Sequence, residues 1–495
     1  MRVFAYLLPL CFLAGECVTS LVMIAEPMPV YAQDSPSQLS FFSTVWPAGP
    51  GQIISSQLPD QELTTMLNEI DPARIQAIIE KLVSFGTRNT LSNQTDPNRG
   101  IGAARDWVAS EMREIAAASG GRMTVTVPSY IQEPASSIPT STVISNIIAT
   151  LRGSSDPGRV YVVSGHYDSR NTNVDNFVDD APGADDDGSG VAVSMELARV
   201  MASHHPAATI MFAVVAGEEQ GLYGSNFMAE QLKNASVDVQ GMLDNDIVGS
   251  STADDGTKDP FNIRMFVQGI PPTETSSQVT ARVSVGGESD TPARELGRFV
   301  AEVASNDVTN MEGKSFLLPL VLTYLTSKPV QMVYRPDRYL RGGDHLSFLR
   351  NGFPAVRFTE PHENFAHQHQ DVRVENGVQF GDLVEFCDFE FNARVARVNG
   401  AALWALAQAP GTPKDVAIDT SQLTNNSTLS WTLDSAAAGY EIVWRPTDLP
   451  SWTHVIPVGK VSRATVLLSK DNVDFGVRAV GSNGYRSPAA FPFSG

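Results

Sequence analysis

The chain has 495 residues, which is too long for one small hydrophobic core, so at least two domains are expected. Apolar residues make up 42% of the sequence, as in a soluble globular protein. Acidic side chains outnumber basic ones by 55 to 35, giving a formal net charge of −20. Binding to nucleic acid needs a basic surface, so this charge balance argues against nucleic acid as the main partner.

The first 32 residues have the pattern of a signal peptide. Arg2 precedes an apolar run, and the small residues Val30 and Ala32 suit cleavage after Ala32. We therefore predict an exported protein, secreted or periplasmic, without stable membrane insertion after cleavage. An uncleaved membrane anchor is the alternative, although Glu16 interrupts the apolar run. Without residues 1–32, Cys387 is the only cysteine and has no partner for an internal disulfide.

Helical and strand-like patterns then alternate along the chain. A helix begins at Asp71, which suits an N-cap, followed by Pro72 at the first helical position. A second helix is predicted over 102–121. Further strands are predicted over 145–153, 158–169, 208–219, 239–250 and 353–360, and further helices over 189–205, 222–232 and 389–408. This alternation predicts an α/β fold with a mostly parallel central sheet flanked by helices.

The pattern changes after a Pro/Gly-rich linker that ends near Lys414. Short alternating runs separated by turn residues predict a small all-β sandwich. We therefore predict a signal peptide over 1–32, an α/β domain over 33–410 and a β-sandwich over 411–495. Through Trp431, Tyr440 and the segment 444–446, this last part resembles a fibronectin type III module. Its aromatic residues are expected in the sandwich core.

Polar side chains cluster where the predicted strands end. His166, Glu218, Glu219 and Asp246 each follow an apolar run; three aspartates precede a predicted helix, and three histidines lie within 362–369. Each feature alone has an ordinary explanation, such as a helix cap or a favourable helix dipole. Parallel strands, however, bring their carboxyl ends to one edge of a sheet. Histidines mixed with carboxylates are ligands that zinc accepts, so this edge is a candidate zinc site.

Two adjacent glutamates can perform two different tasks. A pair of metal ions needs a bridging carboxylate, and water activation needs a general base that is not itself a ligand. Glu218 and Glu219 could supply one ligand and one base. Asp168, two residues after His166, could accept the second ring N–H of a metal-bound His166 and so set its tautomer.

The segments SGHYDS, PGADDDGSG, VAGEEQGLYGS, NDIVGS, GGDHLSF and AHQHQD resemble those of the co-catalytic di-zinc aminopeptidases of clan MH, over roughly residues 84–408. The resemblance implies two zinc ions. It also implies Glu218 as general base and Asp168 as the residue that orients His166. The implied zinc ligands are His166, Asp185, Glu219, Asp246 and His367.

Within this set, Asp185 would bridge the two ions from a cis Asp185–Asp186 peptide. Asp244 is the competitor of Asp246. His367 and Asp371 match the family's pattern of His, three residues and Asp, and His369 and His362 are the rivals of His367. Asp344 and His345, in the GGDH segment, are expected near the site without binding metal.

The implied reaction is removal of N-terminal amino acids from peptides with a free N-terminus, by a metal-bound hydroxide. The alternatives are a glutaminyl cyclase-like acyl transferase, a carboxypeptidase of the same clan, and an inactive receptor-like binding protein. The segment 333–345 is expected to line the entrance. Its three arginines, Arg335, Arg338 and Arg341, could contact substrate carboxylates, but salt bridges within an acidic protein are the favoured interpretation.

Overall fold

The computed structural model describes residues 46–311 and 329–495, so the predicted signal peptide over 1–32 lies outside the described residues. Asp71 caps helix α2 (Pro72–Val83) by accepting the backbone N–H of Ala73, and Pro72 occupies the first helical position, as predicted. No helix in the described part of the chain is long and apolar enough to span a membrane. The helices of the described residues are α1 (Gln61–Asn68), α2 (Pro72–Val83), α3 (Ile101–Ala117), α4 (Gly188–Met201), α5 (Tyr223–Asn234), α6 (Ser276–Ser284), α7 (Pro292–Ala304), α8 (His345–Arg350) and α9 (Phe389–Gln408).

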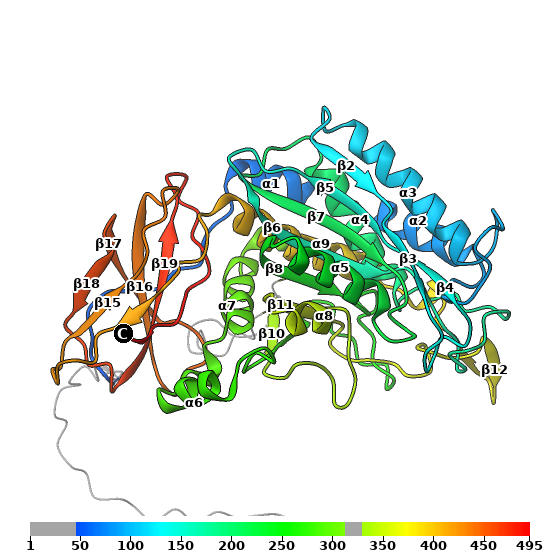
Figure 1. Cartoon of the computed structure of the whole chain (residues 1–495). Coiled ribbons are helices and arrows are strands. Elements are labelled where there is room, and N and C mark those ends of the chain that lie inside the picture. The colour runs from blue at the N-terminus through cyan, green and yellow to red at the C-terminus, as the bar shows by residue number, and fades with distance from the viewer. Residues whose placement is uncertain (1–45, 312–328) are drawn as a thin grey trace, which may run out of the picture. The chain divides into compact units, whose positions relative to one another are not determined.

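An eight-stranded sheet forms the centre of the α/β part (Figure 1). Its middle strands β11, β8, β6 and β7 are mutually parallel, whereas β2, β5 and β9 pair antiparallel to their neighbours β5, β7 and β11. The predicted α/β fold is therefore confirmed, with antiparallel pairs toward the edges of the sheet. In spatial order the strands are β10 (Val330–Val333), β9 (Ile263–Val267), β11 (Ala355–Thr359), β8 (Asp238–Asn245), β6 (Asp156–His166), β7 (Ala208–Val215), β5 (Ile147–Leu151) and β2 (Met123–Thr126).

Both faces of this sheet are buried, which explains its continuous apolar strands. Side chains alternate between the two faces along a strand. In β6, Tyr161 and Val163 belong to the larger apolar core, with residues of α2, α3, α4 and α9. Val160 and Val162 belong to a second core on the other face, with residues of α5 and α8.

Two glycines let α4 begin close to the end of β6. A Cβ atom on Gly165 would lie 2.3 Å from the carbonyl carbon of Gly190, and one on Gly190 would lie 2.1 Å from the carbonyl oxygen of Asn245. Any larger residue would push the start of α4 away from β6 and β8. These contacts bring the aspartates before α4 to the edge of the sheet where His166 ends β6.

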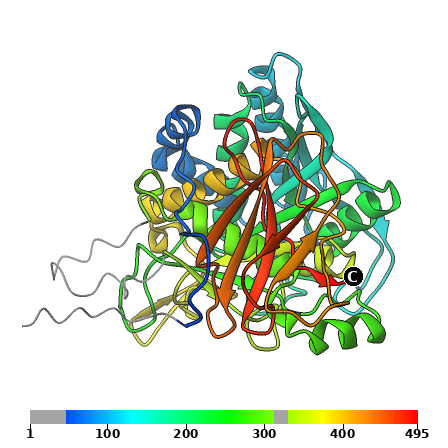
Figure 2. The same cartoon turned by 90° about the vertical axis from the view of Figure 1, so that its left-hand side faces the viewer.

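Two four-stranded sheets follow the α/β part, and Figure 2 shows them facing the viewer. Trp431, Tyr440 and Trp444 are buried in their core, as expected from the sequence. One sheet contains β1 (Gln52–Ile53), β17 (His454–Gly459), β16 (Gly439–Pro446) and β19 (Val473–Val480). The other contains β18 (Arg463–Val466), β15 (Ser427–Ser430), β14 (Ala417–Ile418) and β20 (Phe493–Ser494). The likeness to a fibronectin type III module and the domain boundaries stay predictions.

Buried polar contacts join these sheets to α7, which lies between them and the large sheet in Figure 1. Asp290, just before α7, accepts two hydrogen bonds from Arg445 of β16, both at 2.8 Å, and one from Arg298 of α7 at 2.9 Å. Trp452 donates its indole N–H to Glu295 of α7 at 2.9 Å. Residues 46–495 accordingly form one compact unit.

Candidate metal centre

Polar residues from separate segments meet at one edge of the large sheet. His166 is the last residue of β6, Asp246 follows β8, and Glu218 and Glu219 follow β7. The loop before α4 contributes Asp186. This convergence at the carboxyl ends of parallel strands is the arrangement that the sequence predicts.

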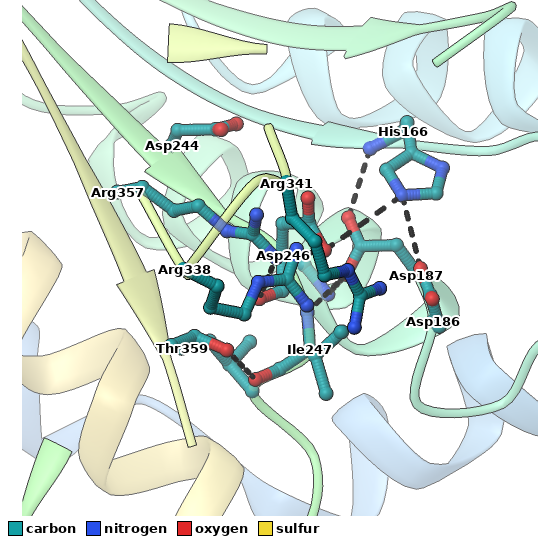
Figure 3. Close-up of polar contacts among 12 residues, drawn as sticks. His166, Asp186, Asp187, Asp244, Asp246, Ile247, Arg338, Arg341, Arg357 and Thr359 are labelled. Atoms are coloured by element: carbon teal, nitrogen blue, oxygen red, sulfur yellow. Dashed lines mark hydrogen bonds and ion pairs between the residues drawn. The ribbon is translucent and has the colours of Figure 1, made fainter. Parts of the chain in front are cut away.

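One candidate metal-binding group consists of His166, Asp186 and Asp246, all buried (Figure 3). His166 Nε2 lies 3.1 Å from Oδ1 of Asp186 and 4.0 Å from Oδ1 of Asp246. The ligand atoms of the three residues lie within 4.8 Å of one another. One histidine nitrogen and two carboxylates form a donor set that suits zinc.

A second group consists of Asp186, Glu219 and His369. His369 Nε2 lies 2.7 Å from Oδ2 of Asp186 and 3.1 Å from Oε1 of Glu219. Asp186 belongs to both groups and turns one carboxylate oxygen to each histidine. This is the position that a carboxylate bridging two metal ions would occupy.

The structure does not bring Asp185 into either group. The carboxylate of Asp185 instead accepts the backbone N–H of Gly249 at 2.7 Å. The expected cis Asp185–Asp186 peptide is also wrong, because the cis bond joins Asp186 and Asp187. Asp187 caps α4 through the N–H of Gly190, as its place in the sequence indicates. The residue directly before this N-cap, Asp186, is the one that faces the histidines.

His367 is likewise outside both groups. Its ring stacks on Phe386, with the centroids 3.4 Å apart and the planes 4° from parallel. His362 is exposed, and only His369 of the three candidates approaches the carboxylates. The spacing between His367 and Asp371 favours His367, whereas the geometry places His369 beside the carboxylates.

The remaining predicted residues lie around the two groups. Asp244, the competitor of Asp246, is engaged elsewhere: its carboxylate accepts the Ser164 hydroxyl at 2.9 Å and the backbone N–H of His345 at 3.1 Å. Asp344 and His345 lie at the start of α8 and belong to neither group. Arg338 and Arg341 both form ion pairs with Glu363, at 3.2 and 3.4 Å respectively.

Hydrogen bonds hold the loops of the site in place. The Asp168 carboxylate accepts the backbone N–H groups of Glu218 and Glu219 at 3.3 and 3.1 Å. The His166 Nδ1 atom lies 3.1 Å from the backbone carbonyl oxygen of Asp168 and 3.5 Å from its Oδ1. Asp168 thus contacts both the histidine and the glutamate loop.

Two further residues, which the sequence did not single out, support the carboxylates. Asp382 accepts the backbone N–H groups of Asp185 and Asp186, both at 2.8 Å. The guanidinium of Arg357 lies 2.8 Å from Oδ1 of Asp246. Both residues come from segments more than 100 positions away from their partners, so no local signal could have identified them.

The charges at the site are strongly coupled. Burial alone would lower the pKa of His369, but Glu219 and Asp186 raise it to about 10. Burial alone would raise the pKa of Asp186, but His369 and His166 hold it well below its ordinary value. Burial raises the pKa of Asp246 to about 6, against the opposing charge of Arg357. The histidines and the carboxylates therefore stabilise one another's charged forms.

These residues fit a bound metal. Nε2 of His166 and Oε1 of Glu219 are buried, and neither makes a hydrogen bond of good geometry within the described part of the chain. Each instead lies 3.1 Å from another member of its own group, Asp186 and His369 respectively. A metal ion among these atoms would bind both members of each contact, since buried polar atoms need partners. The candidate ligands come from two histidines and three carboxylates, a combination typical of zinc.

A cavity of about 430 Å³ opens beside the two groups. Four carboxylates line one part of it, those of Asp186, Glu218, Glu219 and Asp246. Burial raises the pKa of Glu218 well above its ordinary value. The charge of His166 lowers this pKa, and the negative charges of Asp246 and Glu219 raise it further. A carboxylate with a raised pKa is a stronger base, and Glu218 belongs to neither ligand group.

Comparison with known proteins identifies the family of the chain. The model of peptidase family M28 matches residues 146–279. This range includes every predicted zinc ligand except the histidine of 362–369. The chain is 56% identical over 485 residues to a probable zinc metalloprotease of Pyricularia oryzae, covering 95% of this chain and 93% of the relative.

Among solved structures, the chain is similar to the Legionella pneumophila LapA aminopeptidase, at 17% identity and a TM-score of 0.48, covering 72% of this chain and 78% of that one. It is also similar to the glutaminyl cyclase of Porphyromonas gingivalis, at 17% identity and a TM-score of 0.45, covering 67% and 97%. The high identity to the Pyricularia relative over nearly the whole length decides the family. The chain therefore belongs to peptidase family M28, a family of zinc metallopeptidases.

Proposed function

We propose that this zinc metallopeptidase is an aminopeptidase with two zinc ions. His166, Asp186 and Asp246 would hold one ion, and Asp186, Glu219 and His369 the other. The observation that supports two ions is the carboxylate of Asp186, which presents separate oxygens to His166 and His369. The chemistry that zinc supplies in such a site is polarisation of a carbonyl oxygen and acidification of water.

In this proposal, Glu218 is the general base. Its carboxylate takes a proton from the attacking water and passes it to the nitrogen of the leaving amine. The raised pKa of Glu218 suits both steps, because the group is a stronger base when charged and a competent acid once protonated. Asp168 keeps Glu218 in position through the backbone N–H that it accepts at 3.3 Å.

The free N-terminus of a peptide would bind at the acidic part of the cavity. Asp186, Glu219 and Asp246 line it as the proposed zinc ligands, and Glu218, which belongs to neither group, leaves a carboxylate there that attracts a protonated amine. A blocked N-terminus has no charge to place there. This requirement for a free amine distinguishes an aminopeptidase from a carboxypeptidase, which binds the C-terminal carboxylate of its substrate instead.

A substrate panel tests the proposal. The purified, zinc-loaded protein is incubated with amino-acid amides, their N-acetylated forms, and a peptide beginning with glutamine. Release of amino acids only from free-amine substrates, lost with a chelator and restored by zinc, is the expected result. Cyclisation of the glutamine peptide without hydrolysis would instead support the acyl transferase, and cleavage from the C-terminus the carboxypeptidase.

A further inference from the structure

The cavity beside the metal-binding groups carries opposite charges on its walls. Besides the four carboxylate residues, it is lined by Arg338, Arg341 and Arg350. Opposite charges within one cavity match a ligand that itself carries both an amine and a carboxylate. The question is which arginine is available to such a ligand.

Two of the three arginines are already engaged. Arg338 is almost fully buried and pairs with Asp337 at 3.1 Å and Glu363 at 3.2 Å. Arg341 pairs with Glu363 at 3.4 Å and approaches Gln368 at the same distance. Both guanidinium groups are therefore already in contact with carboxylates of the protein.

Arg350 differs from both. It is the last residue of α8, it is exposed, and within the described ranges its guanidinium has no hydrogen-bond or ion-pair partner. A cation in the last turn of a helix favours the helix dipole, but this role requires no particular direction of the side chain. Arg350 is one of the residues that line the cavity, and an arginine without a partner can offer two parallel N–H donors to a carboxylate.

The same cavity contains unusual backbone at two leucines. Leu222 and Leu340 both line it and have positive φ angles of 62° and 59°, a conformation that is uncommon for leucine. Leu340 is 94% exposed, so burial of its own side chain does not stabilise this conformation. Such backbone concentrates at ligand-binding positions, which supports a substrate-contact surface around Arg350.

We propose that Arg350 is a specificity determinant that binds a carboxylate of the substrate. This inference rests on the proposed aminopeptidase function. In a peptide cleaved at its first bond, such a carboxylate has two sources. It is either an acidic side chain or the C-terminal carboxylate of a very short peptide. Both present the same group to the guanidinium.

Three matched peptides separate the two sources. Leu-Gln-amide has no carboxylate, Leu-Glu-amide has one on its side chain, and Leu-Gln has one at its C-terminus. We expect the wild-type protein to prefer at least one carboxylate peptide by about fivefold in kcat/KM, the upper range for an exposed ion pair. The preferred peptide identifies the source. This preference should shrink as the salt concentration rises to about 0.5 M.

Arg350→Gln should remove the preference and Arg350→Glu should reverse it. In both variants, the altered preference should come from a changed KM for the carboxylate peptides. The rate with Leu-Gln-amide should stay within about twofold of wild type. Arg113→Glu is the matched control, because Arg113 is an exposed arginine on α3 that does not line the cavity. A preference that persists in Arg350→Gln, or its absence from the wild type, would overturn the assignment of Arg350.

Failure of the proposed function gives a different result. If the wild type releases no amino acid from these peptides or from the panel of amino-acid amides, the aminopeptidase assignment fails. The affinity of the zinc-loaded protein for the same three peptides, measured by calorimetry, then decides the role of Arg350 without turnover. Tighter binding of a carboxylate peptide that Arg350→Gln abolishes supports the assignment, and equal affinities contradict it.

Discussion

The Oδ2 atom of Asp186 lies 2.7 Å from the Nε2 atom of His369, whereas the ring of His367 stacks on Phe386 outside both candidate groups. We therefore predict that His369→Ala loses about one of two zinc ions, because it removes one of the second group's three ligands. His367→Ala should keep the full zinc content. Metal analysis of both purified variants is the measurement. Zinc loss from His367→Ala with full retention in His369→Ala would contradict this geometry.

The two adjacent glutamates should respond differently to substitution. Glu218→Gln should keep its zinc and lose turnover by a factor of about 10² to 10⁴, the usual contribution of a general base. Glu219→Gln should lose zinc as well, because its Oε1 atom lies 3.1 Å from Nε2 of His369 in the second group. Metal content and amino-acid amide hydrolysis, measured on the same preparations, check both. Near-normal turnover of Glu218→Gln would exclude it as the base.

The ion pair between Asp290 and Arg445 should matter for stability. Neither side chain is more than 3% exposed, and the pair joins the α7 region to the C-terminal sheets. Arg445→Ala leaves Asp290 buried with fewer partners and should lower the free energy of unfolding by about 3–5 kcal/mol. Arg463→Ala is the control, because Arg463 is 64% exposed and should contribute less than about 1 kcal/mol. Denaturant unfolding gives both values, and equal effects would refute the prediction.

Ionisation of Glu363 should make the free energy of unfolding depend on pH in the acidic range. Burial alone would raise its pKa, but Arg338, Arg264 and Arg341 lower it below the ordinary 4.5. Because the pKa of Glu363 is lower in the folded state than in the unfolded state, its charge stabilises the fold at pH values above the unfolded-state pKa. This stabilisation is lost as the pH falls below about 4.5.

Glu363→Gln should therefore be less stable than wild type at pH 7 by about 2 kcal/mol, and this difference should narrow as the pH falls. Unfolding of the metal-free proteins between about pH 3 and pH 7 measures it, so that zinc release does not contribute. Glu375→Gln is the control, since Glu375 is 56% exposed in its pair with Arg373. A difference that is constant with pH would show that Glu363 does not titrate as its partners require.

Much of the fold was predictable because its signals are local. The N-cap at Asp71, the apolar runs of β6 and β7 and the helical pattern of α9 each depend on neighbours within a few residues. The pairing of β1 with β17 was not predictable, because two short segments about 400 residues apart carry no mutual signal in one sequence.

The same division applies to the site. The sequence by itself determined that His166, Glu218, Glu219 and Asp246 follow strand ends, and therefore that they gather at one edge of the sheet. Only the tertiary structure decided which of three consecutive aspartates faces the histidines. Asp382 and Gly249, from distant segments, bind the loop and the carboxylate of Asp185, and this leaves Asp186 between His166 and His369. Side-chain direction in an irregular loop depends on such long-range hydrogen bonds, and local periodicity carries no record of them.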